Sequence, residues 1–204
     1  MMRLLGVYGG TFSPPHLGHL HAAETFRQVV QPDKLLIIPT YLPPHKTETD
    51  GVTAQDRLAM CRIAFSDLDD CEVSDMEIRR GGKSFTSETL QALTGVAERI
   101  ALLVGTDMML TLDAWHEPET IFRLADVYCV RREADNSLTQ QIIDKNERYI
   151  KAYGKKVHVI DVPPLSVAST GIRDMLGKSG SASMLDPRVL AYIRERGLYA
   201  GAAE

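Results

Sequence analysis

Residues 4–20 read LLGVYGGTFSPPHLGHL, and this stretch decides the fold. The apolar run Leu4–Tyr8 predicts a strand that stops at two glycines, and a helical pattern begins at Leu17. A strand, a glycine-rich turn and a helix in this order are typical of a parallel sheet whose strands are joined by helices. In such sheets ligands bind beyond the carboxyl ends of the strands, where this turn would lie.

The same alternation continues along the rest of the chain. The apolar runs Lys34–Ile38 and Ile100–Val104 predict buried strands. Two more strands are predicted at Val127–Val130 and Val157–Ile160, and a short one at Cys71–Val73. Helical patterns cover Leu17–Val30, Ser137–Tyr153, Pro187–Arg196 and the stretch from Thr86 to about Val96. A further helix is predicted after a capping box at Thr53 and Asp56 and runs through Phe65. We therefore predict an α/β fold, a Rossmann-like doubly wound parallel sheet in one domain of residues 1–200. A loop at Gly177–Ser183 and a loose tail at 201–204 complete the prediction.

Composition narrows the class of protein. The chain has 204 residues, 44% of them hydrophobic, and a formal net charge of -4, so it lacks the basic excess of proteins that grip long nucleic acids. The three cysteines form no CxxC pair, which argues against a disulfide framework and a cysteine-based zinc site. The N-terminal apolar stretch is too short for a signal peptide, and no run approaches the ~20 apolar residues of a membrane span. We expect a cytoplasmic protein that acts on small molecules and binds neither nucleic acid nor membranes; the sequence predicts no oligomeric state.

The glycine-rich turn carries two histidines, His16 and His19, at the predicted start of a helix. Glycines let the backbone approach a ligand closely, and a helix N-terminus offers free N–H groups and a positive dipole end. Imidazoles added there make a site for an anion, such as a phosphate whose charge grows in a transition state. Two other interpretations remain: metal ligation with His21, which no carboxylate at a usual ligand spacing supports, and a capped helix start with incidental histidines.

This string resembles the signature of the HxGH nucleotidyltransferases, which transfer nucleotidyl groups from ATP or CTP. More narrowly, GGTFSPPHLGHL is similar to the opening of the bacterial nicotinate-nucleotide adenylyltransferases. That branch usually has Asp where this chain has Ser13. The departure removes a carboxylate from the loop and leaves the histidines in place.

Two further segments match the same branch on the acceptor side. TYLPPHK at Thr40–Lys46 corresponds to a PPHK or PPHR motif that contacts the substrate in the family, although Lys46 alone would be an ordinary surface charge. SFTSETL at Ser84–Leu90 is similar to SYT..TL, whose backbone groups help hold a pyridine carboxylate. Thr86 would equally suit a plain helix start, and the two roles are compatible.

A third match follows the run Ile100–Val104, where Gly105, Asp107 and Trp115 keep the spacing of the family pattern G.D....L..W. A lone tryptophan is usually a core or interface residue, but its ring can also stack on a planar heterocycle. The resemblance implies that Trp115 lies against the nicotinate ring and that Asp107 binds a ribose hydroxyl or orders the site.

The fourth match is VASTGIRDML at residues 167–176, similar to the family motif ISSTxIR, with Ala168 in place of the first serine. Free N–H groups at a helix start, two hydroxyls and a guanidinium form a site for the β- and γ-phosphates of ATP. As structure alone, the segment would be an ordinary N-cap with an exposed arginine.

Together the resemblance implies transfer of AMP from ATP to nicotinic acid mononucleotide, with release of pyrophosphate. The implied catalytic residues are His16, His19 and Arg173; the implied ATP-binding residues are Gly9, Gly10, Thr11, Phe12, Gly18, Gly105, Asp107, Ser169, Thr170 and Arg173; the implied acceptor-binding residues are Thr40, His45, Lys46, Thr86, Trp115 and His116. Mg²⁺ would be held mainly through ATP phosphates, with no protein metal site. The alternatives are an adenylyltransferase acting on nicotinamide mononucleotide or another phosphate monoester, such as phosphopantetheine, and a nucleotide-binding module without catalysis.

Overall fold

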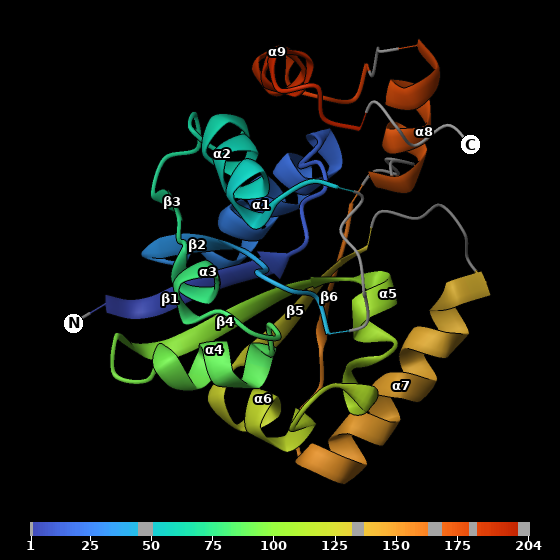
Figure 1. Cartoon of the computed structure of the whole chain (residues 1–204). Helices are drawn as coiled ribbons and strands as arrows, with labels where there is room; N and C mark the ends of the chain where they lie inside the picture. The colour runs from blue at the N-terminus through green and yellow to red at the C-terminus, as the bar shows by residue number, and fades with distance from the viewer. Residues whose placement is uncertain (1, 45–50, 132–136, 163–168, 180–182, 200–204) are drawn as a thin grey trace. The chain divides into compact units, whose positions relative to one another are not determined.

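The computed structural model describes residues 2–44, 51–131, 137–162, 169–179 and 183–199 (Figure 1). Within these residues a six-stranded parallel sheet flanked by helices has the strand order β3-β2-β1-β4-β5-β6. Its strands are β1 (Met2–Gly10), β2 (Lys34–Pro39), β3 (Cys71–Val73), β4 (Ala97–Gly105), β5 (Asp126–Arg131) and β6 (His158–Asp161). The sheet grows from β1 through β2 in one direction and through β4 in the other, so its topological switch point lies at β1 and β4. The predicted α/β class is confirmed.

Strands β1 and β4 extend further than the apolar runs that predict them. Their parallel pairing begins at Met2 opposite Ala97 and continues through Leu4 opposite Arg99 to Tyr8 opposite Leu103. The second part of this ladder is buried on both strands, from Leu5 opposite Ile100 to Tyr8 opposite Leu103, whereas Arg99 in the first part is exposed. An apolar run therefore locates the buried part of a strand and omits the part that solvent reaches.

The helices are α1 (Leu17–Val30), α2 (Ala54–Ala64), α3 (Met76–Arg80), α4 (Thr86–Ala92), α5 (Thr106–Met109), the 3-10 turn η1 (Leu112–Ala114), α6 (Pro118–Leu124), α7 (Ser137–Tyr153), α8 (Ser169–Ser179) and α9 (Pro187–Glu195). The capping box is confirmed, since the Thr53 hydroxyl accepts a hydrogen bond from the Asp56 backbone N–H at 3.1 Å. Helix α4 ends earlier than expected because Gly95, at φ 85°, turns the chain into β4. Helix α8 continues through Ser179, so the predicted loop Gly177–Ser183 is wrong in its first part; residues 180–182 lie outside the described residues.

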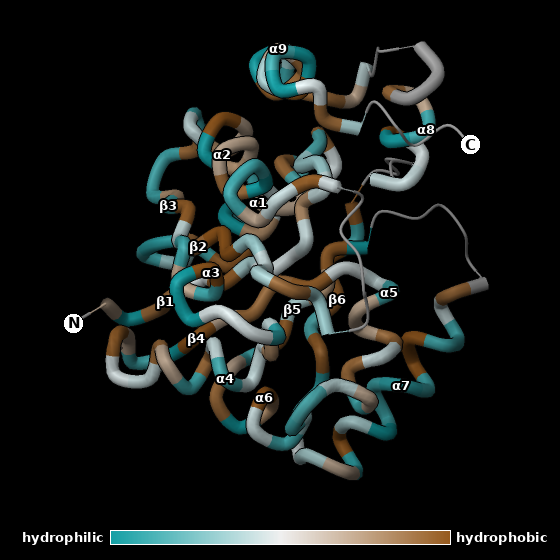
Figure 2. Tube along the Cα trace, viewed as in Figure 1, coloured by the Kyte–Doolittle hydropathy of each residue, from teal (hydrophilic) through white to brown (hydrophobic). Residues whose placement is uncertain are grey.

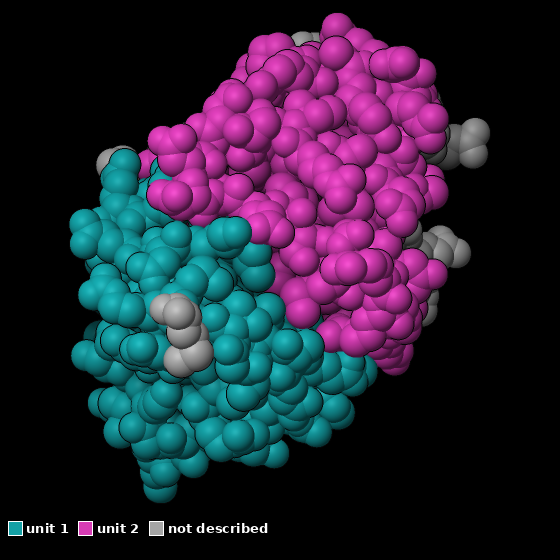
Figure 3. Space-filling view, turned by 90° about the vertical axis from the view of Figure 1, so that its left-hand side faces the viewer, with its two compact units in different colours: residues 1–9, 23–36, 85–166 teal, residues 10–22, 37–84, 167–204 magenta. Residues whose placement is uncertain are grey.

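The chain divides into two compact units, distinguished by colour in Figure 3. Unit 1 contains residues 1–9, 23–36 and 85–166, and unit 2 contains residues 10–22, 37–84 and 167–204. In unit 1, α6 packs against both α4 and α7, and Figure 2 shows hydrophilic and hydrophobic segments alternating along α7. In unit 2, α2 packs against β3 and α9. The predicted domain boundary at residue 200 stays a prediction, because residues 200–204 lie outside the described residues.

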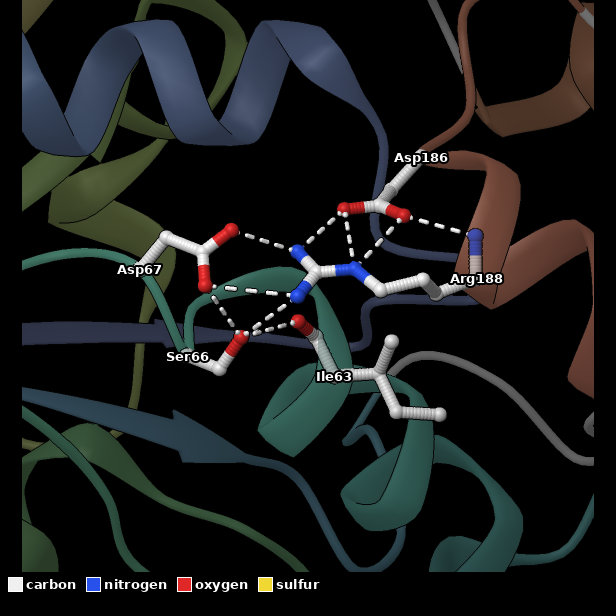
Figure 4. Close-up of polar contacts among 5 residues, drawn as sticks. All are labelled: Ile63, Ser66, Asp67, Asp186 and Arg188. Atoms are coloured by element: carbon white, nitrogen blue, oxygen red, sulfur yellow. Dashed lines mark hydrogen bonds and ion pairs between the residues drawn. The ribbon is translucent and has the colours of Figure 1, made fainter.

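Polar contacts join α9 of unit 2 to α2 and to the turn that follows α2. Figure 4 shows the Arg188 guanidinium between two carboxylates, with Nη2 lying 2.7 Å from both Asp67 and Asp186. The Tyr192 hydroxyl lies 2.9 Å from an oxygen of Asp56, in the first turn of α2. Val189 and Ile193 of α9 are buried and α9 packs against α2, so these polar contacts add to the packing of the two helices.

No described helix combines the length and the apolar character that crossing a membrane requires.

Candidate active site

The loop that follows β1 is built around an aromatic ring. Phe12 has a left-handed backbone with φ 49°, and its buried side chain meets His19 edge-on at 5.0 Å and Phe65 at 5.9 Å between ring centroids. A Cβ added at Gly10 would lie only 3.0 Å from the Phe12 ring, so a glycine is needed here for the ring to fold back. Because the Phe12 side chain belongs to the core, only its backbone is available to the predicted nucleotide.

His16 and His19 stack at the start of α1. Their ring centroids lie 3.7 Å apart with an interplanar angle of 27°. The backbone N–H of His16 donates to Nδ1 of His19 at 3.2 Å. A ring nitrogen that accepts a hydrogen bond carries no proton, so His19 in this arrangement is neutral with its proton on Nε2. The loop thus orients the Nε2–H of His19 as a hydrogen-bond donor.

Residues 10–19 form the histidine loop, and the start of α8 is hydrogen-bonded to it within unit 2. Arg173 donates from Nη1 to the Ser13 carbonyl at 2.9 Å, and the Ser169 hydroxyl donates to the Pro14 carbonyl at 3.3 Å. The same guanidinium reaches the Thr170 hydroxyl through Nη2 at 3.2 Å. The two stretches whose resemblance assigns them to the phosphates of ATP are therefore in contact, although about 150 residues separate them. Free helix N–H groups, hydroxyls, a guanidinium and imidazoles are all hydrogen-bond donors suited to phosphate oxygens.

Ser13, the position that departs from the family pattern, is buried and has a defined partner. Its hydroxyl lies 3.0 Å from the hydroxyl of Tyr199, just after α9. A serine at this position therefore connects the histidine loop to the C-terminal segment through two neutral hydroxyls.

The loop after β2 is joined to the histidine loop through its backbone. The N–H of Thr40 donates to the Gly10 carbonyl at 2.9 Å, and the N–H of Tyr41 donates to the Ser84 hydroxyl at 2.9 Å. The predicted phosphate ligands His45 and Lys46 lie outside the described residues. The structure thus describes the base of this loop, and the roles of the two side chains beyond it stay predictions.

Sequence reasoning missed Arg57, a buried arginine of α2 in contact with both loops. Its Nη1 donates to the Thr11 carbonyl at 2.9 Å and its Nη2 donates to the Tyr41 carbonyl at 3.0 Å. Burial lowers the pKa of Arg57 from its ordinary value, while nearby acidic groups such as Glu77 act in the opposite direction. No sequence motif surrounds Arg57, so its role becomes evident only from the hydrogen bonds that it makes in the folded structure.

Another five predicted residues belong to unit 1: Thr86 begins α4, and the other four lie at or after the end of β4. Gly105 ends the strand, Asp107 is exposed in the first turn of α5, and Trp115 is half-buried with its indole N–H 3.3 Å from the Thr111 hydroxyl. The His116 ring lies 4.3 Å from the ring of Phe85, the residue before Thr86. The structure therefore brings the two segments assigned to the pyridine ring together.

Helix α7 holds the α5–η1 segment that leads to Trp115. The Tyr149 hydroxyl donates to the Met109 carbonyl at 2.5 Å, and Lys145 binds both carboxylate oxygens of Asp113 at 2.7 Å. Burial, together with the charge of Asp113, raises the pKa of Tyr149 to about 12, so its hydroxyl stays a proton donor at neutral pH. These contacts anchor the path of the chain between β4 and the tryptophan.

Arg131 is a second cation that the sequence did not single out. It ends β5, and its largely buried side chain lies 3.7 Å from Asp161 at the end of β6. Carboxyl ends of parallel strands are where such sheets bind ligands. The signal that could have found it is its position directly after the apolar run Val127–Val130.

In the described part of the chain, no group of three or more His, Cys, Asp or Glu side chains could hold a metal ion. The third histidine of the string, His21, is half-buried on α1. The described donors are mainly N–H groups, hydroxyls and cations, which suit anionic oxygens better than a cation.

Comparison with known proteins gives a consistent result. Residues 7–175 match the model of the family described as "Cytidylyltransferase-like". The chain is 34% identical to a protein of Desulfatibacillum aliphaticivorans named "Probable nicotinate-nucleotide adenylyltransferase", covering 96% of this chain and 99% of the relative. A protein of the same name from Exiguobacterium sibiricum is 35% identical, covering 96% and 98%.

A solved structure of Plasmodium falciparum nicotinic acid mononucleotide adenylyltransferase complexed with NaAD resembles this chain in fold. The TM-score is 0.76 at 16% sequence identity, and the match covers 97% of this chain and 98% of the other. At 16% identity this likeness supports the architecture alone, and membership of the family rests on the family model and the relatives described above.

Proposed function

This chain belongs to the cytidylyltransferase-like family, and from its nicotinate-nucleotide adenylyltransferase relatives we propose that it transfers AMP from ATP to nicotinic acid mononucleotide. The products are nicotinic acid adenine dinucleotide and pyrophosphate. The observation that carries the proposal is the contact of the His16–His19 loop with the start of α8 through Arg173 and Ser169. This arrangement gathers donors from two distant segments around one position where a triphosphate can bind.

The reaction is an in-line displacement at the α-phosphorus of ATP. A phosphate oxygen of the acceptor forms the new bond, the bond from the α-phosphorus to the oxygen that bridges to the β-phosphorus breaks, and pyrophosphate leaves. Both reactants are anions, so the enzyme must position them and neutralise charge; no nucleophilic side chain is needed. A phosphate monoester is already largely deprotonated near neutral pH, so a general base contributes little.

We assign the phosphates of ATP to unit 2. Nε2–H of His19, with His16, stabilises negative charge on the α- and β-phosphates, in keeping with the hydrogen bond that fixes the His19 tautomer. Arg173, Ser169 and Thr170 bind the leaving pyrophosphate at the start of α8. Backbone groups of Gly10, Thr11, Phe12 and Gly18 in unit 2 are assigned to ATP as well. The ATP-binding roles of Gly9, Gly105 and Asp107, which belong to unit 1, stay predictions.

We assign the pyridine ring of the acceptor to unit 1. Trp115 stacks on the ring, with Thr86 and His116 beside it, which agrees with the approach of His116 to Phe85. Thr40, His45 and Lys46 are assigned to the acceptor's phosphate. Within the described residues, a Cβ added at Gly105 would meet no heavy atom within 4 Å, so this position leaves room for a ligand against the backbone.

Mg²⁺ enters this scheme as part of the ATP substrate. A magnesium ion keeps several waters and binds phosphate oxygens, so it requires no cage of carboxylates. Bound to ATP, it would neutralise part of the phosphate charge. Asp107, exposed in α5 directly after β4, is the acidic residue among those assigned to ATP.

Two measurements on the purified protein test the proposal. Mixing ATP, Mg²⁺ and nicotinic acid mononucleotide should release pyrophosphate, and omission of the mononucleotide should abolish the release. Because Trp115 is the single tryptophan of the chain, titration with nicotinic acid mononucleotide should change its fluorescence. Nicotinamide mononucleotide serves as the matched ligand that lacks the carboxylate, and a larger response to it would reverse the assigned acceptor. Absence of pyrophosphate release with every mononucleotide would refute the proposed reaction.

A further inference from the structure

Arg57 lies completely buried in unit 2 and contacts two separate loops. It projects from the first turn of α2, and its relative exposure is 0%. Nη1 donates to the Thr11 carbonyl at 2.9 Å and lies 3.4 Å from the Thr40 hydroxyl, and Nη2 donates to the Tyr41 carbonyl at 3.0 Å. One planar guanidinium therefore satisfies oxygen atoms from two stretches of non-helical backbone.

A contribution to fold stability does not account for this placement. Moving a charged group from water into a protein interior costs several kcal/mol, and apolar residues of similar volume are often as stabilising as buried ions. What a guanidinium supplies that an apolar side chain lacks is a rigid fork of donors with fixed directions. Such a fork fixes the relative position of the acceptors that it joins.

The two loops whose carbonyls accept hydrogen bonds from Arg57 are the ones to which the phosphates of the two substrates are assigned. Thr11 lies in the loop that leads to His16 and His19, and Tyr41 lies in the loop that leads toward the PPHK motif. Between them the backbone adds one direct bond, from the Thr40 N–H to the Gly10 carbonyl at 2.9 Å. In-line attack requires the attacking oxygen and the α-phosphorus to be held in a narrow range of geometry, and a displacement of about 1 Å can lower the rate about 100-fold.

We propose that Arg57 is a positioning residue that holds the histidine loop and the loop after β2 at a fixed distance, so that acceptor and ATP are aligned for transfer. The inference rests on the proposed function, because it assigns one reactant to each loop. Arg57 itself touches no reacting atom. Its effect passes through the carbonyls of Thr11 and Tyr41.

The variants Arg57→Met and Arg57→Lys, with Arg62→Met as control, test this role. Arg62 lies on the same helix and is exposed, so its variant matches the chemistry of the change without touching either loop. At a temperature well below the unfolding transition, Arg57→Met should lower kcat/KM for both substrates by at least about 10-fold. Arg57→Lys should recover only part of the loss, because an ammonium acts as a point charge and lacks the fork geometry that spans both carbonyls. Arg62→Met should behave as wild type.

A purely structural role gives a different pattern. Arg57→Met would then lower the melting temperature, while kcat per folded molecule and both KM values remained those of wild type, and this result would overturn the proposal. Hydrogen–deuterium exchange provides a readout that needs no activity: amides of Gly10–His16 and Thr40–Leu42 should exchange faster in both Arg57 variants than in wild type. Unchanged exchange in both loops would also overturn it, whereas an inactive wild-type protein would refute the proposed function alone.

Discussion

Individual side chains of the histidine loop provide the proposed phosphate-binding chemistry. His16 and His19 stack at 3.7 Å, and the His16 N–H fixes which nitrogen of His19 can donate. Phe12 packs against His19, whose ring its own buried ring meets edge-on. The loop therefore presents one oriented N–H donor at the positive end of α1, where a phosphate is favoured.

Substitutions at His19 distinguish the role of Nδ1 as a hydrogen-bond acceptor from that of Nε2 as a donor. His19→Ala should reduce turnover by about 100-fold or more with the fold intact, because a donor to the developing phosphate charge is lost. In His19→Asn the amide oxygen can still accept from the His16 N–H, but no donor stands in the place of Nε2, so activity should stay low. His19→Gln places an amide nitrogen near that position and should recover part of the rate.

Steady-state turnover with both substrates saturating is the measurement for this series. His21→Ala is the control, because His21 is another half-buried histidine of α1 that has no assigned role. A His19→Ala rate close to that of wild type would remove the histidine pair from the mechanism.

Among the helices, α8 contributes to the site through its first turn. Arg173→Ala should raise the KM for ATP about 10-fold or more and change the KM for the mononucleotide much less, because a charge-assisted bond to the pyrophosphate group is lost. Asp174→Asn, at the next and exposed position of α8, is the control. Initial rates measured across a range of ATP concentrations decide the matter, and an ATP dependence identical to that of wild type contradicts the assignment.

The pairing of α2 with α9 should make stability sensitive to acid through Asp56. Burial acts to raise the pKa of Asp56, but hydrogen bonds from Thr53 and Tyr192 and the charge of Arg196 act to lower it and prevail. A carboxyl with a lowered pKa in the folded state stabilises the protein above its unfolded pKa of about 4, and this contribution is lost as pH falls through the folded pKa.

Asp56→Asn should therefore lower the free energy of unfolding at pH 7 by about 1–3 kcal/mol, and the difference from wild type should shrink as pH falls below about 4. Urea denaturation at several pH values measures this difference. Asp69→Asn changes an exposed aspartate beyond the end of α2 and serves as the reference. A constant difference between Asp56→Asn and wild type at every pH would show that the carboxylate charge has no part in docking α9.

At the scale of the whole chain, contacts between segments that are distant in sequence assemble the candidate site of unit 2. Ser13 and Tyr199 share a buried hydrogen bond across 186 positions of sequence. The Leu17 N–H also donates to the Met184 carbonyl at 2.9 Å, so the C-terminal segment meets the histidine loop at a second place. The C-terminal residues thus support the start of α1 although they belong to none of the assigned ligand motifs.

A double-mutant cycle measures this long-range support. Ser13→Ala, Tyr199→Phe and the double variant should show a coupling of about 1 kcal/mol in the free energy of unfolding, the usual net value of one buried hydrogen bond. Ser13→Ala combined with Tyr192→Phe is the matched control, because Tyr192 bonds to Asp56 instead. Additive effects in the Ser13–Tyr199 cycle would mean that the two hydroxyls do not interact in solution.

The short connecting helices show where sequence patterns stop being informative. Helices α3, α5 and α6 have only five, four and seven residues, too few for the repeated apolar spacing that predicts a helix. The long α7, by contrast, matches its prediction at both ends. The end of α4 at Ala92 was missed because a left-handed glycine, rather than a change in apolar pattern, turns the chain.

Local order along the chain was enough to predict the strands, the longer helices and the motifs after β1, after β4 and at the start of α8. Each of these depends on neighbours within a few positions, and apolar periodicity and spacing record such neighbours directly. The partners of Arg57 and of Ser13 required the folded chain. Arg57 reaches Thr11 across 46 positions and Ser13 reaches Tyr199 across 186, and no local pattern records which distant carbonyl or hydroxyl a buried donor meets.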